Sequence, residues 1–400
     1  MIAQLQKHVR LWFLTAIALL AAVPPAIARD FTYEYAGQTL TYTVLSEEDK
    51  TCETKQGANN YSGNYVRGEV IIPECVFDGA DTYTVTTIGE NSFYHQTGLT
   101  SVKIPNTVIT IGSNAFYRCE DLTSIEIPSS VTIIGDKAFM SCTGLTSIEI
   151  HNSVTTIGSF AFWNCKALTS IEIPSSVTTI GERAFAECYG LTSIEIPSSV
   201  TSIGSSAFQS CTSLSSVIYN CDVTGNNLFL NSPVRDFTFG GAVVPDEMVR
   251  LLCINSVEDF TFSSPVTTIG KSAFSGISGL TSIEIPNTVT TIGESAFSGS
   301  PGLTSIEIPS TVTTIGKNAF WGCSNLTSVI NNSDAYAIDM FVNSPVSDLT
   351  IGGTIVPDFM ARDIGVWESL KRLTLTDKVI AIGEHAFDGC TGLISVKIPN

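Results

Sequence analysis

The sequence predicts an elongated α/β solenoid, and an internal repeat is the main reason. Residues 168–181 read LTSIEIPSSVTTIG, and residues 191–204 repeat them with one Thr replaced by Ser. Close copies begin at Leu145, Leu122 and Leu99, so the period is about 23 residues, enough for one supersecondary unit. A unit this short cannot bury its own apolar face, and we therefore expect successive units to stack as coils.

Each part of the unit LTSIEIPSSVTTIGxxAFxxCxG predicts an element. LTSIEI alternates polar and β-branched residues, which predicts a short strand that ends at Pro because Pro has no ladder donor. Stacked strands would form a parallel sheet on one face. The Gly, as at Gly204, permits a sharp turn that a residue with a Cβ would resist. AFxxC predicts a short helical or 3₁₀ turn that closes the coil on the other face. The largest inward ladder is then made of Phe93, Phe116, Phe139, Phe162, Phe185, Phe208, Phe274, Phe297, Phe320 and Phe387.

Residues 1–28 are typical of a secretory signal peptide. Lys7 and Arg10 precede an apolar run over 11–23, and Ala26-Ile27-Ala28 is a small-x-small cleavage site. The run is shorter than the roughly 20 residues that a membrane span needs, and no later run approaches that length. We expect a secreted, extracellular protein without a transmembrane span after cleavage; association with the cell surface or outer membrane stays open.

Residues 29–85 predict an N-terminal β-rich cap, and residues 86–400 the solenoid. Residues 31–44 alternate around Ala36-Gly37, which predicts a hairpin, and residues 70–73 resemble a degenerate first strand. The cap would cover the first open sheet edge. The sequence stops at Asn400 in the middle of a unit, which leads us to expect a truncated gene product or fragment.

Two stretches, 217–265 and 329–378, depart from the consensus, but the second matches the first at a constant offset. Asn231-Ser-Pro-Val234, for example, returns as Asn343-Ser-Pro-Val346. Strand-like segments continue through both stretches, so we expect variant coils rather than interruptions. In these coils segments such as 245–252 replace AFxxC and predict longer true helices with Pro245 in the first turn.

Composition narrows the function classes. The net charge of −18 argues against nucleic acid as a partner, because phosphates are neutralised by Lys and Arg. Seven of the 11 cysteines occupy one slot of the repeat, which predicts free, buried thiols: Cys119, Cys142, Cys165, Cys188, Cys211, Cys323 and Cys390. Cys52 and Cys75 lie outside the array, and whether they pair stays open. No CxxC or paired His predicts a metal site, and we expect no cofactor.

The motif LxxIxIPxxVxxIGxxAFxxC over about residues 86–400 resembles the BspA-like class of bacterial leucine-rich repeats. The resemblance implies a curved solenoid with parallel strands on one face, and export by anaerobic, host-associated bacteria. Some members of that class are surface adhesins that bind host matrix proteins or mediate coaggregation. The class has no universal binding residues, so none can be transferred to this chain.

The exposed side of the predicted strands carries rows of like residues. The rows that we take as candidate binding residues are Glu126, Glu149, Glu172, Glu195, Glu284 and Glu307, with Thr146, Thr169 and Thr192 beside them. Lys103 and Lys397 share the glutamate slot nearer the ends. The row suits a basic partner or divalent cations, but it equally suits a solvated face copied with the repeat.

Catalysis is not expected. Equivalent glutamates offer no asymmetry to separate the pKa values of an acid and a nucleophile. After the signal peptide the histidines, His95, His151 and His385, fall in distant coils and cannot converge. We interpret Trp163 and Trp321 as partly buried surface aromatics rather than a sugar-stacking platform.

Three functions follow from these observations. The first is a secreted or surface-exposed recognition or adhesion protein that binds a protein or glycan, such as a host extracellular matrix protein, through its repeat face. The alternative is a passive spacer or surface-layer component without a specific ligand. A divalent-cation-dependent module is the third.

Overall fold

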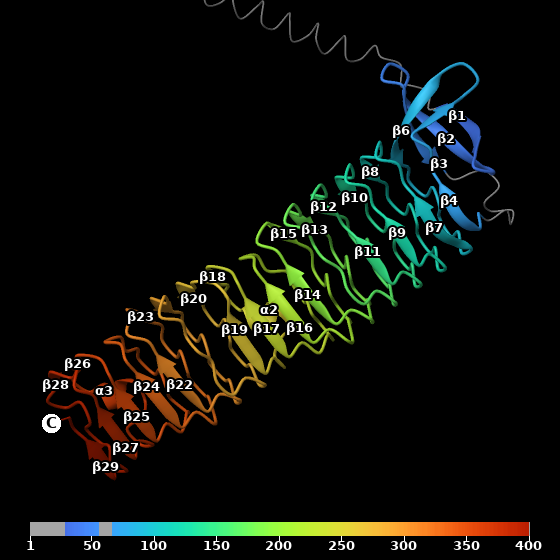
Figure 1. Ribbon diagram of the computed structural model, residues 1–400. Helices are drawn as coiled ribbons and strands as arrows, with labels where there is room; N and C mark the ends of the chain where they lie inside the picture. The colour runs from blue at the N-terminus through green and yellow to red at the C-terminus, as the bar shows by residue number, and fades with distance from the viewer. Residues whose placement is uncertain (1–28, 56–65, 400) are drawn as a thin grey trace, which may run out of the picture.

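The computed structural model describes residues 29–55 and 66–399, and these form one elongated rod (Figure 1). A small β-rich unit lies at the N-terminal end, and the coils follow in sequence order to the other end. The signal peptide predicted over 1–28 lies outside the described residues. A typical coil has three sides: one strand, one shorter strand, and a stack of turns.

The strands of the first side run parallel and in register, and we call their solvent side the strand face. Ile148 lies opposite Ile125 in the neighbouring coil, and both are buried. The strands are β4 (Gly68–Ile71), β7 (Leu99–Lys103), β9 (Ser124–Glu126), β11 (Ser147–Glu149), β14 (Ser193–Ile196), β16 (Ser216–Tyr219), β17 (Asp236–Phe239), β19 (Asp259–Phe262), β22 (Ser305–Ile308), β24 (Ser328–Asn331), β25 (Asp348–Ile351), β27 (Arg372–Leu375) and β29 (Ser395–Lys397).

The second side consists mostly of two-residue strands from the VTTI segments. They pair in parallel from coil to coil, as β10 does with β8 and β12. The strands are β6 (Thr82–Ile88), β8 (Thr110–Ile111), β10 (Ile133–Ile134), β12 (Thr156–Ile157), β13 (Thr179–Ile180), β15 (Ser202–Ile203), β18 (Val243–Val244), β20 (Thr268–Ile269), β21 (Thr291–Ile292), β23 (Thr314–Ile315), β26 (Ile355–Val356) and β28 (Ala381–Ile382). The sequence predicted one sheet face, and the structure has two such sides.

The N-terminal strands extend both sides. β1 (Asp30–Tyr35) and β2 (Gln38–Ser46) form the predicted antiparallel hairpin, and β3 (Thr51–Lys55) joins β2 to β6. β5 (Cys75–Phe77) also pairs with β6. β4 pairs with β7, which confirms the degenerate first strand.

The phenylalanine ladder forms the centre of the core. Phe93, Phe116 and Phe139 stack with ring centroids 5.2 Å apart and planes 2° and 7° from parallel. The ladder enters both variant stretches, because Phe229 stacks on Phe208 and Phe341 on Phe320, but Val249 and Ala361 take the Phe position in the coil that follows. Parallel pairing continues there, from β16 through β17 to β19 and from β24 through β25 to β27. The solenoid therefore passes straight through both variant stretches, as the sequence predicted.

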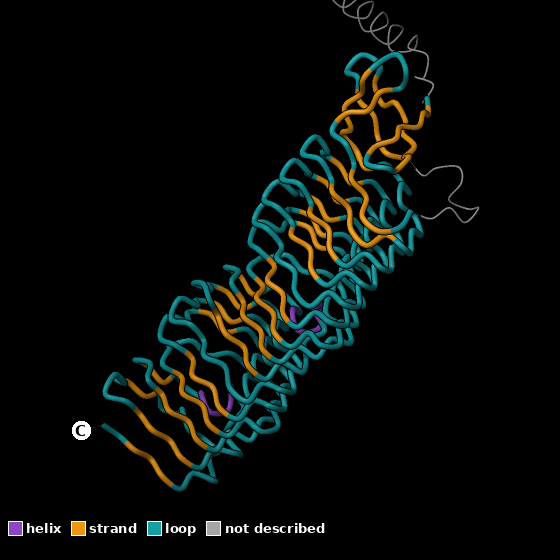
Figure 2. The backbone as a smooth tube through the Cα atoms, turned by 45° about the vertical axis from the view of Figure 1, so that its right-hand side comes forward, coloured by secondary structure: helices purple, strands orange, loops and turns teal. Residues whose placement is uncertain are grey.

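The turn side corrects the predicted α/β class and its helical face. Figure 2 shows stacked turns along that side, and the helices within residues 29–55 and 66–399 are the short α2 (Met248–Leu252) and α3 (Met360–Asp363). Twice in a typical coil a residue has positive φ, as at Asn114 (+53°) and Arg118 (+56°), which a right-handed helix of L-residues does not tolerate. The N–H of Asn114, Phe116 and Arg118 donates to the next coil, whereas the N–H of Tyr117 donates three residues back. Because these donors serve the stack, the fold is a leucine-rich β-solenoid.

The longer helices predicted in the variant coils are also wrong. They are single turns, α2 (Met248–Leu252) and α3 (Met360–Asp363). Glu247, with φ of 53°, precedes α2 and excludes Pro245 from it. Its N–H donates to the next coil, as in the regular turns.

The repeated cysteines are free, as predicted, and so are Cys52 and Cys75. The predicted burial holds for all of the repeated cysteines except Cys390, which is half-buried in the last described coil. The repeat thiols also have a hydrogen-bonding role that the sequence did not reveal. Cys188 Sγ donates to the carbonyl of Phe162 at 3.2 Å, and Cys211 Sγ does the same to Phe185. In the first variant coil Ser232 Oγ donates to Phe208 O at 2.8 Å.

Candidate functional site

The glutamate row lies on the strand face as the alternation of LTSIEI requires. In each strand Ile points inward and Glu outward: Ile125 is buried and Glu126 exposed. All six candidate glutamates are exposed, and so are Thr146, Thr169 and Thr192. The strand face therefore presents the predicted residues to solvent.

The row is not continuous, however. Lys103, Glu126 and Glu149 are register partners in successive strands, and Glu284 is paired with Glu307. Between these segments the same register position holds Ile218, Thr238 and Thr261. The structure thus brings together two acidic segments, one with Glu126, Glu149, Glu172 and Glu195, the other with Glu284 and Glu307.

Each acidic segment ends on a glutamate held by an asparagine. Asn220 Nδ2 donates to Glu195 Oε1 at 2.9 Å, and Asn332 Nδ2 donates to Glu307 Oε1 at 2.8 Å. Sequence reasoning missed both asparagines, although their equivalent places in the two variant stretches were a usable signal. At the other end Lys103 Nζ pairs with Glu69 Oε1 at 3.0 Å, so Lys103 has an acidic partner of its own.

The threonine row also has a structural role. Thr146 Oγ1 donates to the backbone carbonyl of Thr123 at 3.2 Å, and Thr304 Oγ1 to that of Thr281. A hydroxyl that bonds the neighbouring coil is partly committed to the stack. The threonines flank the acidic segments as predicted, but the glutamates are the groups free to attract a charged ligand.

Two hollows lie on the acidic segments. One of about 470 Å³ is lined by Glu149, His151 and Glu172, and another of about 380 Å³ by Glu284 and Glu307. The coil of Glu172 contributes to neither flanking sheet, since β11 and β14 belong to different sheets. His151 Nδ1 lies 3.6 Å from Glu149 Oε1. These shallow hollows are edged by carboxylates and could receive a basic side chain.

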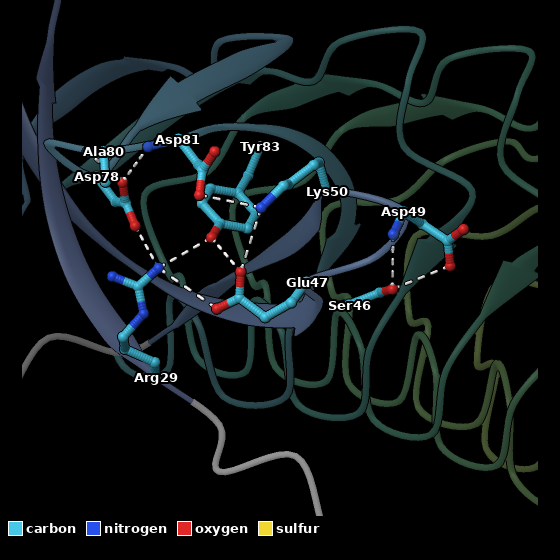
Figure 3. Close-up of polar contacts among 9 residues, drawn as sticks. All are labelled: Arg29, Ser46, Glu47, Asp49, Lys50, Asp78, Ala80, Asp81 and Tyr83. Atoms are coloured by element: carbon cyan, nitrogen blue, oxygen red, sulfur yellow. Dashed lines mark hydrogen bonds and ion pairs between the residues drawn. The ribbon is translucent and has the colours of Figure 1, made fainter.

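A second polar cluster lies in the N-terminal unit, away from the strand face (Figure 3). Arg29 contacts Asp78, Tyr83 and Glu47. The N–H groups of Asp81 and Ala80, followed by Arg29, lower the pKa of Asp78 to about 2. The charged groups of this cluster are paired with one another. The cluster therefore joins the loops after β2 and β5 to Arg29, at the start of the described chain.

Within residues 29–55 and 66–399 no group of three or more His, Cys, Asp or Glu side chains could hold a metal ion. The histidines after the signal peptide lie in separate coils, as expected. In the same residues no helix is long and apolar enough to cross a membrane.

Comparisons with known proteins agree on the repeat. Six copies of a region described as "BspA type Leucine rich repeat region" match residues 81–165, 132–244, 252–356 and 366–400. None of the curated proteins matches this chain.

Several of the solved structures that are similar to the chain come from bacteria. A leucine-rich repeat protein from Bacteroides ovatus is 28% identical over 92% of this chain and 83% of its own, with a TM-score of 0.40. A leucine rich cell surface protein from Faecalibacterium prausnitzii is 26% identical over 92% and 95%, with a TM-score of 0.39. A leucine rich repeat protein from T. pallidum is 26% identical over 51% and 83%, with a TM-score of 0.40.

Proposed function

This chain belongs to the BspA-type leucine-rich repeat family, and from that premise we propose that it is an exported protein-binding scaffold that recognises a basic partner on its strand face. The observation that supports the proposal is the exposed acidic segment of Glu126, Glu149, Glu172 and Glu195, in which Glu126 and Glu149 are register partners, on a backbone fixed by the stacked core. The proposed setting is outside the cell, secreted or held at the surface, as the signal-like residues 1–28 suggest.

The partner's chemistry follows from the row. Parallel strands lie about 4.8 Å apart, so successive carboxylates repeat at intervals that a basic peptide segment can match. Mutual repulsion among the glutamates, about 1 kcal/mol or less per pair in water, falls when a cation lies between them. A host matrix or partner-cell protein with a Lys- or Arg-rich segment fits this surface; a spacer would make no use of it.

The test is a binding series with the full exported chain. Wild type is passed over immobilised fibronectin, fibrinogen, laminin and collagen, and its affinity for any ligand that binds is compared with that of two variants. One carries Gln at Glu126, Glu149, Glu172 and Glu195. The control carries Gln or Asn at four exposed acids off the strand face, Glu90, Glu120, Asp121 and Glu384, and so has the same net charge.

We expect the strand-face variant to lose about tenfold or more in affinity and the control less than about threefold, because local complementarity rather than net charge controls the complex. Affinity should also fall as salt rises. Equal losses in both variants, or no ligand in the panel, would contradict the proposal and favour the spacer. Binding that requires calcium and disappears with a chelator would instead support the cation-dependent module.

A further inference from the structure

The turn side carries a second recessed site, away from the glutamate rows. A hollow of about 170 Å³ is lined by Met140, Phe160, Trp163, Arg183, Ala186, Glu187 and Gln209. We call it the Trp163 hollow. Its size is below the range of drug-sized sites, so it suits one ring-sized group.

The hollow exists because a small residue follows a large one. The residue after the ladder Phe forms a row along the turns, and Tyr94 and Tyr117 in that row stack 4.8 Å apart at 7°. Trp163 is followed in the row by Ala186, whose side chain has only one carbon. The coils adjoin, since Asn164 N–H donates to Ala186 O at 2.9 Å. Part of the indole therefore stays uncovered and half-exposed.

Two cationic side chains lie over the ring of Phe160, which lines the hollow. Arg183 Cζ lies 5.8 Å from the ring centroid of Phe160, and Lys137 Nζ lies 6.0 Å from the same centroid. Arg183 is exposed, and its Nε lies 4.0 Å from Glu182 Oε1, at the limit of an ion pair. The guanidinium is therefore held over an aromatic ring while its other donors face the hollow or solvent.

Acceptors complete the lining. Glu187 receives a hydrogen bond from Tyr189 Oη at one carboxylate oxygen, at 3.2 Å, which leaves the other oxygen to accept from a ligand. Gln209 adds an amide that both donates and accepts. A matching ligand needs an apolar ring face for Trp163, hydroxyl donors for Glu187, and an anionic group for Arg183.

The sequence favoured a surface aromatic over a sugar-stacking platform at Trp163, and the hollow beside this indole reverses that preference. We propose that the Trp163 hollow binds one carboxylate-bearing sugar unit of an acidic glycan. The C–H face of a pyranose packs on the indole, its carboxylate pairs with Arg183, and its hydroxyls bond Glu187 and Gln209. The site is separate from the strand face and does not depend on the function proposed for it. A peptide with an acidic and an aromatic residue is the competing ligand that the experiment must exclude.

The experiment titrates the full chain, by calorimetry, with a hyaluronan tetrasaccharide, which contains glucuronate, and with fully N-acetylated chitotetraose, a neutral saccharide of equal length. We expect hyaluronan to bind about tenfold more tightly than chitotetraose. Trp163→Ala should weaken both about tenfold, and Arg183→Gln should abolish the preference for the acidic saccharide. The matched control is Trp321→Ala, at the same slot of the repeat, with no change expected.

Equal affinity for the two saccharides, no heat at millimolar concentration, or the same loss in Trp321→Ala would overturn the proposal. So would tighter binding of the acetylated peptide Asp-Tyr-Asp than of hyaluronan. If Trp163→Ala does not fold, Arg183→Gln, a change at an exposed residue, still tests the proposal. The measured quantity is then the ratio of its affinities for hyaluronan and chitotetraose. The strand-face variant with four glutamines should bind hyaluronan as wild type does, which separates failure here from failure of the proposed function.

Discussion

The regular coil that ends at Cys211 and the variant coil that follows it share a core but differ on the surface. Phe208 and Phe229 stack 5.6 Å apart, and Ser232 donates to a phenylalanine carbonyl as Cys211 does. On the strand face, by contrast, Glu195 gives way to Ile218. The stack therefore constrains inward positions and leaves outward ones free to change.

The difference separates the positions that the stacked core constrains from the positions that it leaves free to vary. Replacing Cys by Ser preserves a donor to a buried carbonyl, so the substitution keeps the same hydrogen bond. Replacing Glu by Ile or Thr preserves nothing chemical, yet the strands stay in register. Because the backbone tolerates either surface, folding does not require the division of the strand face into two acidic segments.

The largest expected effect tests whether the phenylalanine ladder stabilises the regular coil and the variant coil equally. Phe162→Ala removes a ring stacked 5.3 Å and 5.2 Å from its neighbours and should lower the free energy of unfolding by about 3–5 kcal/mol. Phe229→Ala in the variant coil should cost a similar amount. Hydrogen exchange of the flanking amides measures both. A negligible loss at Phe229 would break the claim that the core continues through the variant coil.

Replacing a glycine by alanine should lower stability more in a regular coil than in a variant coil. A Cβ at Gly204 would lie 2.2 Å from the backbone N of Glu182, whereas one at Gly225 would lie 3.1 Å from the nearest atom. We expect Gly204→Ala to cost about 3 kcal/mol, at the upper end for overpacking, and Gly225→Ala about 1 kcal/mol. Thermal unfolding of the two variants gives the comparison, and equal losses would contradict it. Close approach, rather than a positive φ, explains the glycine at 204.

The thiol and hydroxyl ladders should be interchangeable. Cys188→Ala leaves the buried carbonyl of Phe162 without its donor and should cost about 1–2 kcal/mol, as should Ser232→Ala. Cys188→Ser restores a donor and should cost less than Cys188→Ala. Denaturant midpoints measure the three variants. A Ser variant no better than the Ala variant would show that the thiol acts only as an apolar group.

Alkaline pH should weaken in particular the coils that have Cys in the repeat slot. Burial raises the pKa of Cys119, Cys165 and Cys211 to about 12, against an ordinary value of 9.0. Below pH 9 these thiols stay protonated in both states; above it only the unfolded chain loses protons, so stability falls as pH rises towards 12. By pH 10 the loss should be about 1 kcal/mol per thiol.

Hydrogen exchange at pH 8 and pH 10, corrected for the intrinsic rate, compares the two regions. Exchange should accelerate more in the coils of Cys119, Cys165 and Cys211 than in the coil of Ser300. Ser300 takes the Cys slot there, its hydroxyl donates to Phe274 O, and residues 280–302 contain neither Cys nor Tyr. Uniform acceleration along the rod would contradict the assignment to the thiols.

Much of the fold could be predicted from the repeat. Alternation in LTSIEI placed Glu195 outside and Ile194 inside, and the hairpin at Ala36-Gly37 was recognisable from alternation around a turn. The non-helical conformation of the turn side could not be predicted. AFxxC has the spacing of a helix, and the residues with positive φ, such as Arg118, leave no signal in the local sequence. Asn220 and Trp163 acquire their roles only beside the next coil, so neither could be assigned from its own unit.

The period of the repeat by itself determined that the chain stacks, which residues face the core, and that like side chains form rows. These follow from burial, which depends on the order of apolar and polar residues along one unit. The tertiary structure alone decided where hydrogen bonds run on the turn side and where a row is interrupted or hollow. Those features arise between coils, because a donor or a ring in one coil is completed by whatever residue the next coil places beside it.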